Sequence, residues 1–307
     1  MLTKTAKLMG ASIQLSLSHP QADEVLNAAM EKLRKFEQRF SANDPHSDLS
    51  YLNQHAHLEM IKVHPELFKL IEIGIDHSLA EDSYLNIAIG PLVQLWRIGF
   101  QDAQIPHEKE IKDILPLIDP KNIILDSHQR SVGFKFANMA IDLGALAKGY
   151  AADLLKQYML KSGAEAGLID LGGNILTFGP NPTRPNGQWN IGLQEPESKR
   201  GKHFAIVKTL NQSVVTSGIY VRQLEHQGKN YHHIFDSQTG YPIDSSIASL
   251  TIISQLSIDG EIWTSRLFGY PIDTIIKKIE AVPHIEGIVM TKQGVCQVSS
   301  GAKHLII

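Results

Sequence analysis

The order in which predicted helices and β-hairpins follow one another constrains the fold of this chain most strongly. Three segments have the hairpin pattern of two apolar runs joined by a short polar turn, at residues 123–136, 214–236 and 285–299. A strand at 13–17 precedes them, and helical periodicity marks residues 20–40, 65–78, 142–160 and 261–281, the last interrupted at 269–271. Because no strand–helix–strand repeat is present, we expect an α+β fold of mixed, largely antiparallel sheets packed with helices.

Composition narrows the function classes. With 307 residues, of which 43% are hydrophobic, the chain can bury an ordinary core as one large unit or as two domains. The 29 Lys and Arg residues balance 32 Asp and Glu residues, so nucleic acid is not expected as the main partner. No apolar run reaches the ~18–20 residues of a membrane span. Residues 83–99 are apolar, but the Gly90-Pro91 pair within them predicts a loop between elements.

The single cysteine and the first residues bear on the cellular compartment. Cys296 has no partner for a disulfide or a CxxC metal site, and its position in an apolar run predicts a buried strand residue. The N-terminal lysines are not followed by the apolar stretch of ~7–15 residues that an export signal needs. We therefore expect a cytoplasmic protein.

The segment at residues 141–153 is the most informative for chemistry. Small residues lead from a predicted strand into a helix, where unpaired N–H groups and the helix dipole favour an anion. Lys148 would add positive charge there. The alternative is a tight packing turn that leaves Lys148 in solvent. A nucleotide loop of the Walker type is excluded because no Ser or Thr follows the lysine.

Two other segments carry weaker signals. The strand at 167–171 ends in Gly172-Gly173, which does not match the GxGxxG pattern and is equally compatible with a simple turn. His232 and His233 would face opposite sides of a strand, so they cannot both bind one metal without a bulge. One histidine is therefore a candidate functional residue and the other a packed one, while a purely structural role for both remains the alternative.

Taken together, these segments resemble one family, the ApbE-type FAD:protein FMN transferases. Seven motifs agree in order and spacing and extend over nearly the whole chain: residues 142–149, 171–174, 216–220, 233–242, 9–10, 47–53 and 89–96. The resemblance implies one catalytic unit over residues 1–307. It also implies a Mg²⁺-dependent enzyme that cleaves the FAD pyrophosphate, attaches FMN to a Ser or Thr of an acceptor flavoprotein and releases AMP.

The resemblance also implies roles for individual residues. Asp142 and Lys148 match FAD-contacting positions, and His233 matches the suspected general base. Ile234 lies in the flavin-site motif. The remaining positions that match the lining of the FAD pocket are Met9, Asn43, Ala88, Ile89 and Gly90.

For the metal, the resemblance implies a ligand set that includes one backbone oxygen, from Ala145. The family pattern ends with an Asp and a Thr four residues apart, and the alignment through Leu267 and Phe268 places Glu261 and Ser265 there. Residues at i and i+4 share a helix face, whereas Asp259 and Thr264 are five apart. Glutamate adds one methylene, and serine keeps the hydroxyl.

Departures from the family pattern leave two alternatives to a transferase. Asp236-Ser237, residues 96–99 and Ala11 differ from the residues that the family prefers. Such changes near the flavin are compatible with a pyrophosphatase that releases free FMN and AMP, or with a non-catalytic FAD-binding protein.

Overall fold

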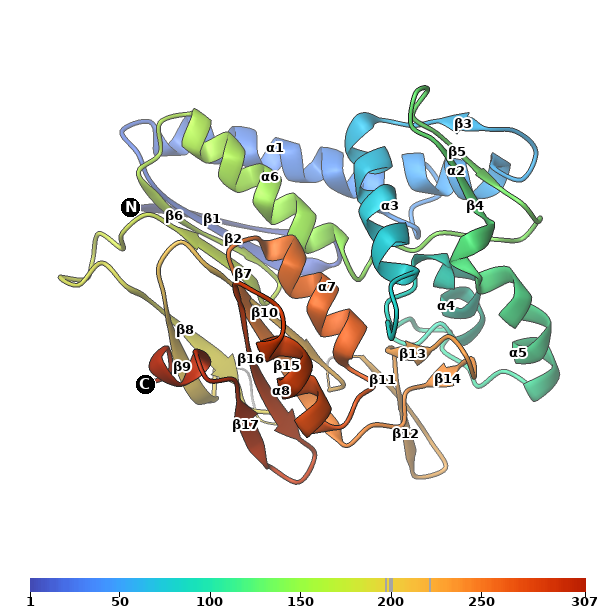
Figure 1. Ribbon diagram of the computed structural model, residues 1–307. Helices are drawn as coiled ribbons and strands as arrows, with labels where there is room; N and C mark the ends of the chain where they lie inside the picture. The colour runs from blue at the N-terminus through green and yellow to red at the C-terminus, as the bar shows by residue number, and fades with distance from the viewer. Residues whose placement is uncertain (197, 199–200, 221) are drawn as a thin grey trace.

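An eight-stranded sheet forms the centre of the molecule. The computed structural model describes residues 1–196, 198, 201–220 and 222–307. Every neighbouring pair in this sheet is antiparallel. In spatial order its strands are β1 (Leu2–Leu8), β2 (Ala11–Ser18), β6 (Ala166–Leu171), β7 (Asn174–Phe178), β10 (Ser213–Gly218), β15 (Ile247–Ser254), β16 (Ile285–Thr291) and β17 (Cys296–Val298) (Figure 1).

Both faces of this sheet are covered. Four helices pack against its strands, namely α1 (Ala22–Phe40), α6 (Ala147–Lys161), α7 (Ser257–Leu267) and α8 (Ile272–Glu280) (Figure 1). The hairpin of β8 (Trp189–Gln194) and β9 (His203–Thr209) packs against the other face. Accordingly, Ile252 belongs to the cluster under α7 and α8, whereas the next residue, Ile253, packs with β8 and β9. The alternation of a strand therefore places apolar residues in two cores.

A second group of elements lies beside the α6–α7 end of the sheet (Figure 1). The helices of this group are α2 (Asp48–His55), α3 (Pro65–Ser78), α4 (Gly90–Trp96) and α5 (Glu108–Ile114). Its 3₁₀ turns are η1 (Ile87–Ile89), η2 (Leu115–Ile118) and η3 (Pro120–Asn122). Outside this group, the 3₁₀ turn η4 (Ala302–His304) lies near the C-terminus. The strands of the group are β3 (Ile61–Lys62), β4 (Ile123–Asp126), β5 (Ser131–Phe134), β11 (Gln223–His226), β12 (Lys229–His232), β13 (Phe235–Asp236) and β14 (Tyr241–Pro242). Trp96 is fully buried and its indole N–H donates to the carbonyl of Gly240 at 3.0 Å, which joins α4 to the turn between β13 and β14.

The α+β class with largely antiparallel sheets is confirmed, and so are the hairpins β4–β5 and β16–β17. The expectation of one hairpin over 214–236 was wrong, because residues 214–218 belong to β10 of the large sheet and only β11 and β12 pair around Gln227-Gly228. The Gly90-Pro91 pair does not break the chain into a loop but begins α4, since proline fits the first turn of a helix.

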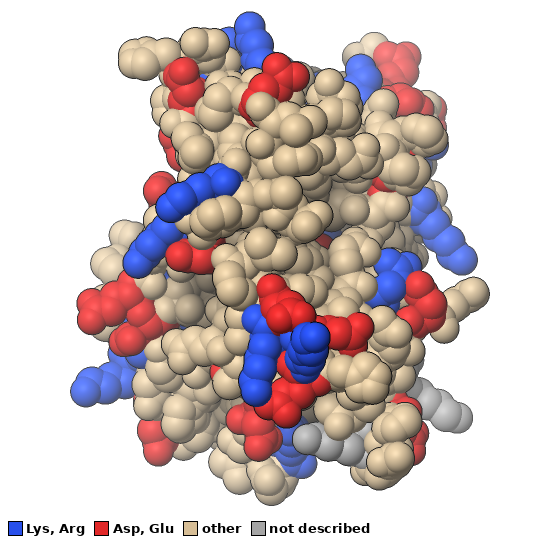
Figure 2. Space-filling model, turned by 90° about the vertical axis from the view of Figure 1, so that its right-hand side faces the viewer, with Lys and Arg blue, Asp and Glu red and all other residues tan. Residues whose placement is uncertain are grey.

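Two further expectations are corrected. The helix predicted from residue 142 begins at Ala147, and residues 142–146 form the turn that precedes it. Cys296 lies in the predicted strand, but β17 is an edge strand and the side chain is exposed. On the face shown in Figure 2, basic and acidic side chains are interspersed. Among the described residues, no helix combines the length and the apolar character of a membrane span.

Candidate active site

The first turn of α6 and the middle of α7 meet at an ion pair. Lys148 Nζ lies 3.2 Å from Glu261 Oε1, and the Glu261 side chain is only 6% exposed. The same carboxylate oxygen accepts a hydrogen bond of 2.9 Å from the side-chain amide of Asn174. A buried carboxylate needs such partners, because desolvation would otherwise favour its neutral form. Two residues predicted for different roles, FAD contact and metal binding, thus lie together.

Close packing of α6 against α7 positions this pair. A methyl group built on Gly149 would lie 2.6 Å from the Ser257 carbonyl oxygen and 2.7 Å from Glu261 Cγ. Any larger residue at 149 would therefore push α7 away. Asp153, one turn further along α6, accepts the backbone N–H groups of Ser257 and Ile258 at 2.8 and 2.9 Å and so caps α7.

Asn174 links the glycine turn to this helix pair. It follows Gly172-Gly173, which connects β6 to β7, and its Oδ1 accepts the Ser257 hydroxyl at 2.5 Å. Its amide nitrogen is the donor to Glu261. The glycine pair is therefore the turn of a hairpin, and the residue after it orients the buried carboxylate.

Asp142 lies in the turn before α6 and is tied to the predicted FAD-lining segment. Its backbone N–H donates to the Ile87 carbonyl at 2.8 Å, next to Ala88, while its Oδ1 accepts the Gly144 N–H at 2.7 Å. Asn53 of α2 holds Ile141 by two hydrogen bonds, to its N–H and its carbonyl. Burial raises the pKa of the Asp142 carboxyl, and the Gly144 N–H and the charge of Arg222 oppose this effect.

The two adjacent histidines have different environments. His232 is buried, with Nε2 at 2.9 Å from the Ile243 carbonyl and Nδ1 accepting the Ile234 N–H, so both ring nitrogens are occupied within the fold. His233 is partly exposed, and its Nδ1 lies 3.4 Å from the carbonyl of Arg222. A carbonyl only accepts, so Nδ1 carries the proton and Nε2 is the basic nitrogen.

The remaining predicted positions occupy loops and helix ends. Met9 and Gly10 form the two-residue turn between β1 and β2, both with positive φ, and the Met9 N–H donates to Glu37 Oε1 at 2.6 Å. Asn43 is exposed in the loop after α1, and Ala145 is exposed in the turn before α6. Ile234 follows His233, and Ser265 lies one turn beyond Glu261 on α7. Ala88 and Ile89 belong to the 3₁₀ turn η1, and Gly90 begins α4.

Sequence reasoning missed two residues at this site. Asp153 lies within the segment that was singled out, but its capping role depends on the position of α7. Arg222 comes two residues after the 216–220 motif, and its charge acts on both Asp142 and His233. The signal for Arg222 was its proximity to that motif, and only the tertiary structure connects it to the other two residues.

The donor set fits a magnesium ion that binds together with a phosphate-bearing substrate. Among the described residues, no three His, Cys, Asp or Glu side chains gather as a metal site of their own. Mg²⁺ commonly binds one or two carboxylates and completes its shell with water and phosphate oxygens. The buried Glu261 carboxylate, the Ser265 hydroxyl one turn away and the exposed backbone at Ala145 provide oxygen donors of this kind.

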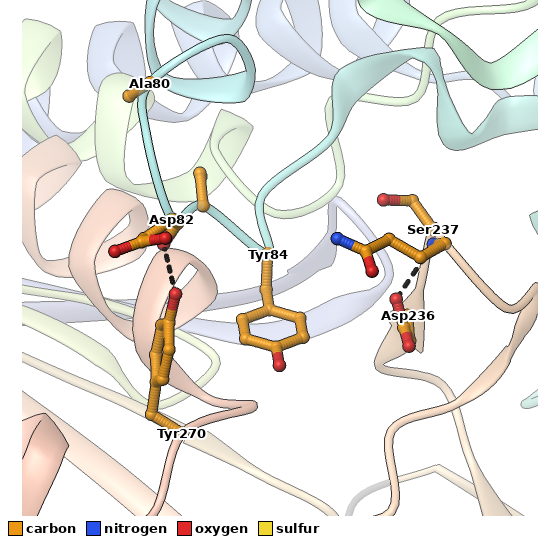
Figure 3. A pocket seen from close by; sticks show the side chains of 8 residues that line it. Ala80, Asp82, Tyr84, Asp236, Ser237 and Tyr270 are labelled. Carbon is orange, nitrogen blue, oxygen red and sulfur yellow. Dashed lines mark hydrogen bonds between the residues drawn. The ribbon is translucent and has the colours of Figure 1, made fainter.

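A separate cavity of about 300 Å³ lies near Tyr84 and Tyr270. Figure 3 shows the Tyr84 ring between Asp82 and Tyr270 on one side and Asp236 and Ser237 on the other. The Tyr270 hydroxyl donates to the Asp82 carbonyl at 3.0 Å. None of the twelve predicted site residues lines this cavity, but Asp236 and Ser237 of the 233–242 motif do.

Comparison with curated proteins identifies relatives along most of the chain. An FAD:protein FMN transferase from Klebsiella pneumoniae (strain 342) is 37% identical over 289 residues, which cover 94% of this chain and 88% of the relative. An FAD:protein FMN transferase from Treponema pallidum (strain Nichols) is 32% identical and covers 80% of this chain and 72% of that protein.

Solved structures agree in fold. The ApbE protein of Thermotoga maritima has a TM-score of 0.90 at 24% identity, covering 99% of this chain and 98% of that one. The flavin transferase ApbE from Vibrio cholerae has a TM-score of 0.85 at 22% identity, with coverage of 99% and 98%. The model of the ApbE family matches residues 9–289. From this match and the extent of the sequence relatives, the chain belongs to the ApbE family.

Proposed function

We propose that this protein is an Mg²⁺-dependent FAD:protein FMN transferase that attaches FMN through a phosphoester to a Ser or Thr of an acceptor flavoprotein and releases AMP. The curated relatives named above support the activity. The observation that carries the proposal is the arrangement of His233, whose Nδ1–H is held by a backbone carbonyl while Nε2 is the basic nitrogen, within the electrostatic influence of Lys148.

His233 suits the role of general base. Burial, then the charge of Arg222, lowers the pKa of His233 to about 4. The ring is therefore neutral at pH 7 with a lone pair on Nε2, and it is a weaker base than an ordinary histidine. In the proposed reaction the acceptor hydroxyl oxygen attacks the phosphorus on the FMN side of the pyrophosphate. Its proton passes to His233 Nε2 as the new P–O bond forms.

The leaving group is AMP, which departs with the electron pair of the broken P–O bond. Lys148 and the N–H groups at the start of α6 would stabilise the negative charge on its phosphate. Mg²⁺, held by Glu261, Ser265 and the Ala145 carbonyl, would supply additional charge neutralisation at the pyrophosphate. Asp142, Met9, Asn43, Ile234 and the 88–90 segment are proposed to line the FAD pocket.

The test is an incubation of the purified protein with FAD, MgCl₂ and a candidate acceptor flavoprotein, with the acceptor's Ser or Thr changed to Ala as control. We expect in-gel flavin fluorescence on the denatured acceptor, stoichiometric AMP, and neither product with the control acceptor. Free FMN and AMP without covalent flavin would identify a pyrophosphatase instead. FAD that survives intact would identify a binding protein.

A further inference from the structure

Arg222 connects three separate parts of the candidate site. It directly precedes β11, and its side chain packs over Gly99, where an added methyl group would lie 2.8 Å from Arg222 Cδ. Its guanidinium reaches the β1–β2 turn, with Nη2 at 3.9 Å from a methyl group built on Gly10. Because Gly10 is the neighbour of Met9, the arginine spans from the β11 loop to the predicted FAD-lining turn.

The charge of this arginine acts on two predicted site residues. It opposes the rise in the pKa of the Asp142 carboxyl, and it lowers the pKa of His233. Its own carbonyl meanwhile holds the His233 Nδ1–H.

Lys148 and Arg222 differ in how their charges are balanced. Lys148 forms an ion pair with Glu261. Within the part of the chain that the structure describes, Arg222 forms no ion pair with a carboxylate, as is also true of Arg130, Arg184 and Arg266, whereas Arg34, Arg39 and Arg97 each form one. The Arg222 guanidinium thus has no ion-pair partner among the described residues, and its charge acts on Asp142 and His233. Arginine in such a position binds phosphate well, because its planar donors match two oxygens at once.

We propose that the Arg222 guanidinium binds the pyrophosphate of FAD, while its backbone carbonyl orients His233. The inference rests on the proposed function, because it assigns a phosphate-binding residue to the same site. The two roles use different atoms, so changing the side chain removes the phosphate contact and leaves the carbonyl in place. The residue is thus a substrate-binding group through its side chain and a positioning group through its backbone.

The experiment compares R222Q and R222K with the wild type and with R34Q, a control at an exposed arginine that pairs with Glu31. The dissociation constant for FAD is measured in MgCl₂ without acceptor at several KCl concentrations, and circular dichroism confirms folding. We expect R222Q to weaken FAD binding about tenfold or more and to make the dissociation constant depend less on the KCl concentration. R222K should restore part of the affinity, and R34Q should match the wild type.

Two results would overturn the inference. One is unchanged FAD affinity in R222Q. The other is weaker binding with an unchanged salt dependence, which would mean that Arg222 supports only the local packing over Gly99. Both results are measurements of FAD binding without acceptor, so neither depends on FMN transfer. A wild-type protein that binds FAD but modifies no acceptor would contradict the proposed function and leave the role of Arg222 standing.

Discussion

At the scale of single residues, two adjacent histidines have different hydrogen-bond environments. Both ring nitrogens of His232 are bonded within the fold, and burial further lowers its pKa. His233 has one nitrogen held by a carbonyl. The sequence indicated that one of the pair would be packed and the other functional. The hydrogen bonds identify His232 as the packed one.

Replacement of His233 by Ala is expected to slow transfer by about 100-fold or more, because the acceptor hydroxyl loses its base. FAD affinity should stay within a few-fold. His226→Ala, at an exposed position on β11, is the control and should leave the rate unchanged. Single-turnover transfer and FAD titration give both quantities. Loss of FAD binding in the His233 variant would instead make this residue part of the pocket wall.

The pH dependence follows from the lowered pKa of His233, about 4 in the free protein. A base is active when unprotonated, so a lowered pKa extends its active range toward acid. We expect the His233 contribution to kcat/KM to stay constant from pH 8 down to about 5 and to fall below it. An acid limb near the ordinary histidine value of about 6.5 would contradict the low pKa.

Glu261→Gln is expected to weaken the Mg²⁺ dependence far more than Asp259→Asn. Glu261 is buried beside Lys148, whereas Asp259 lies two residues earlier on α7 and is partly exposed. A neutral amide is a poor Mg²⁺ ligand, so the Mg²⁺ concentration for half-maximal rate should rise about tenfold or more in the first variant. Equal effects in both variants would reject the assignment of Glu261.

At the scale of elements, the packing of α6 against α7 depends on a carboxylate that lies away from the reacting groups. Burial raises the pKa of Asp153 to about 6, and its bonds to the Ser257 and Ile258 N–H groups oppose that shift. The folded protein therefore binds a proton at Asp153 more tightly than the unfolded chain, for which the value is 3.8. The contribution of Asp153 to the free energy of unfolding therefore increases as the pH falls through 6 toward 4.

Asp153→Asn removes this titration. Between pH 7 and pH 5, the free energy of unfolding of the wild type should gain about 1 kcal/mol relative to the variant. His233 titrates in both proteins, so its contribution cancels in the difference between their free energies of unfolding, and the remaining pH dependence comes from Asp153. Urea unfolding at the two pH values provides the measurement. Parallel pH profiles would show that Asp153 does not titrate in this range.

At the scale of the whole molecule, the candidate site collects residues from many parts of the chain. Predicted site residues lie in the β1–β2 turn, at the start of α6, in the middle of α7 and after β12. A ligand that contacts all of them stabilises the folded state as a unit. FAD at 100 times its dissociation constant should add about 2.7 kcal/mol to the free energy of unfolding.

Removal of the metal should reduce that stabilisation. We expect the rise in Tm that FAD produces with MgCl₂ to shrink when EDTA replaces the metal, since the pyrophosphate then loses part of its charge neutralisation. In Glu261→Gln the difference between MgCl₂ and EDTA should nearly disappear. An FAD-induced shift that is identical with and without metal in the wild type would contradict a shared FAD and Mg²⁺ site.

The sequence predicted elements well where one periodicity dominated. The hairpins β4–β5 and β16–β17 were anticipated because their turns are local, and α1 because its apolar face repeats regularly. The sequence did not predict strand pairing correctly where the partner strand lies far away along the chain. Residues 214–218 pair with β7 and β15, whose sequences are distant, and no local signal marks that choice. The cytoplasmic location and the single-unit organisation stay predictions.

The sequence by itself determined the family and the α+β class, because motif order and local hydrophobic patterns are carried by neighbours along the chain. The tertiary structure alone decided which groups meet. Lys148 reaches Glu261 because Gly149 lets two helices approach closely, and Asn174 and Asp153 then fix α7. Arg222 acts on His233 and Asp142 through charge, which depends on distance in space.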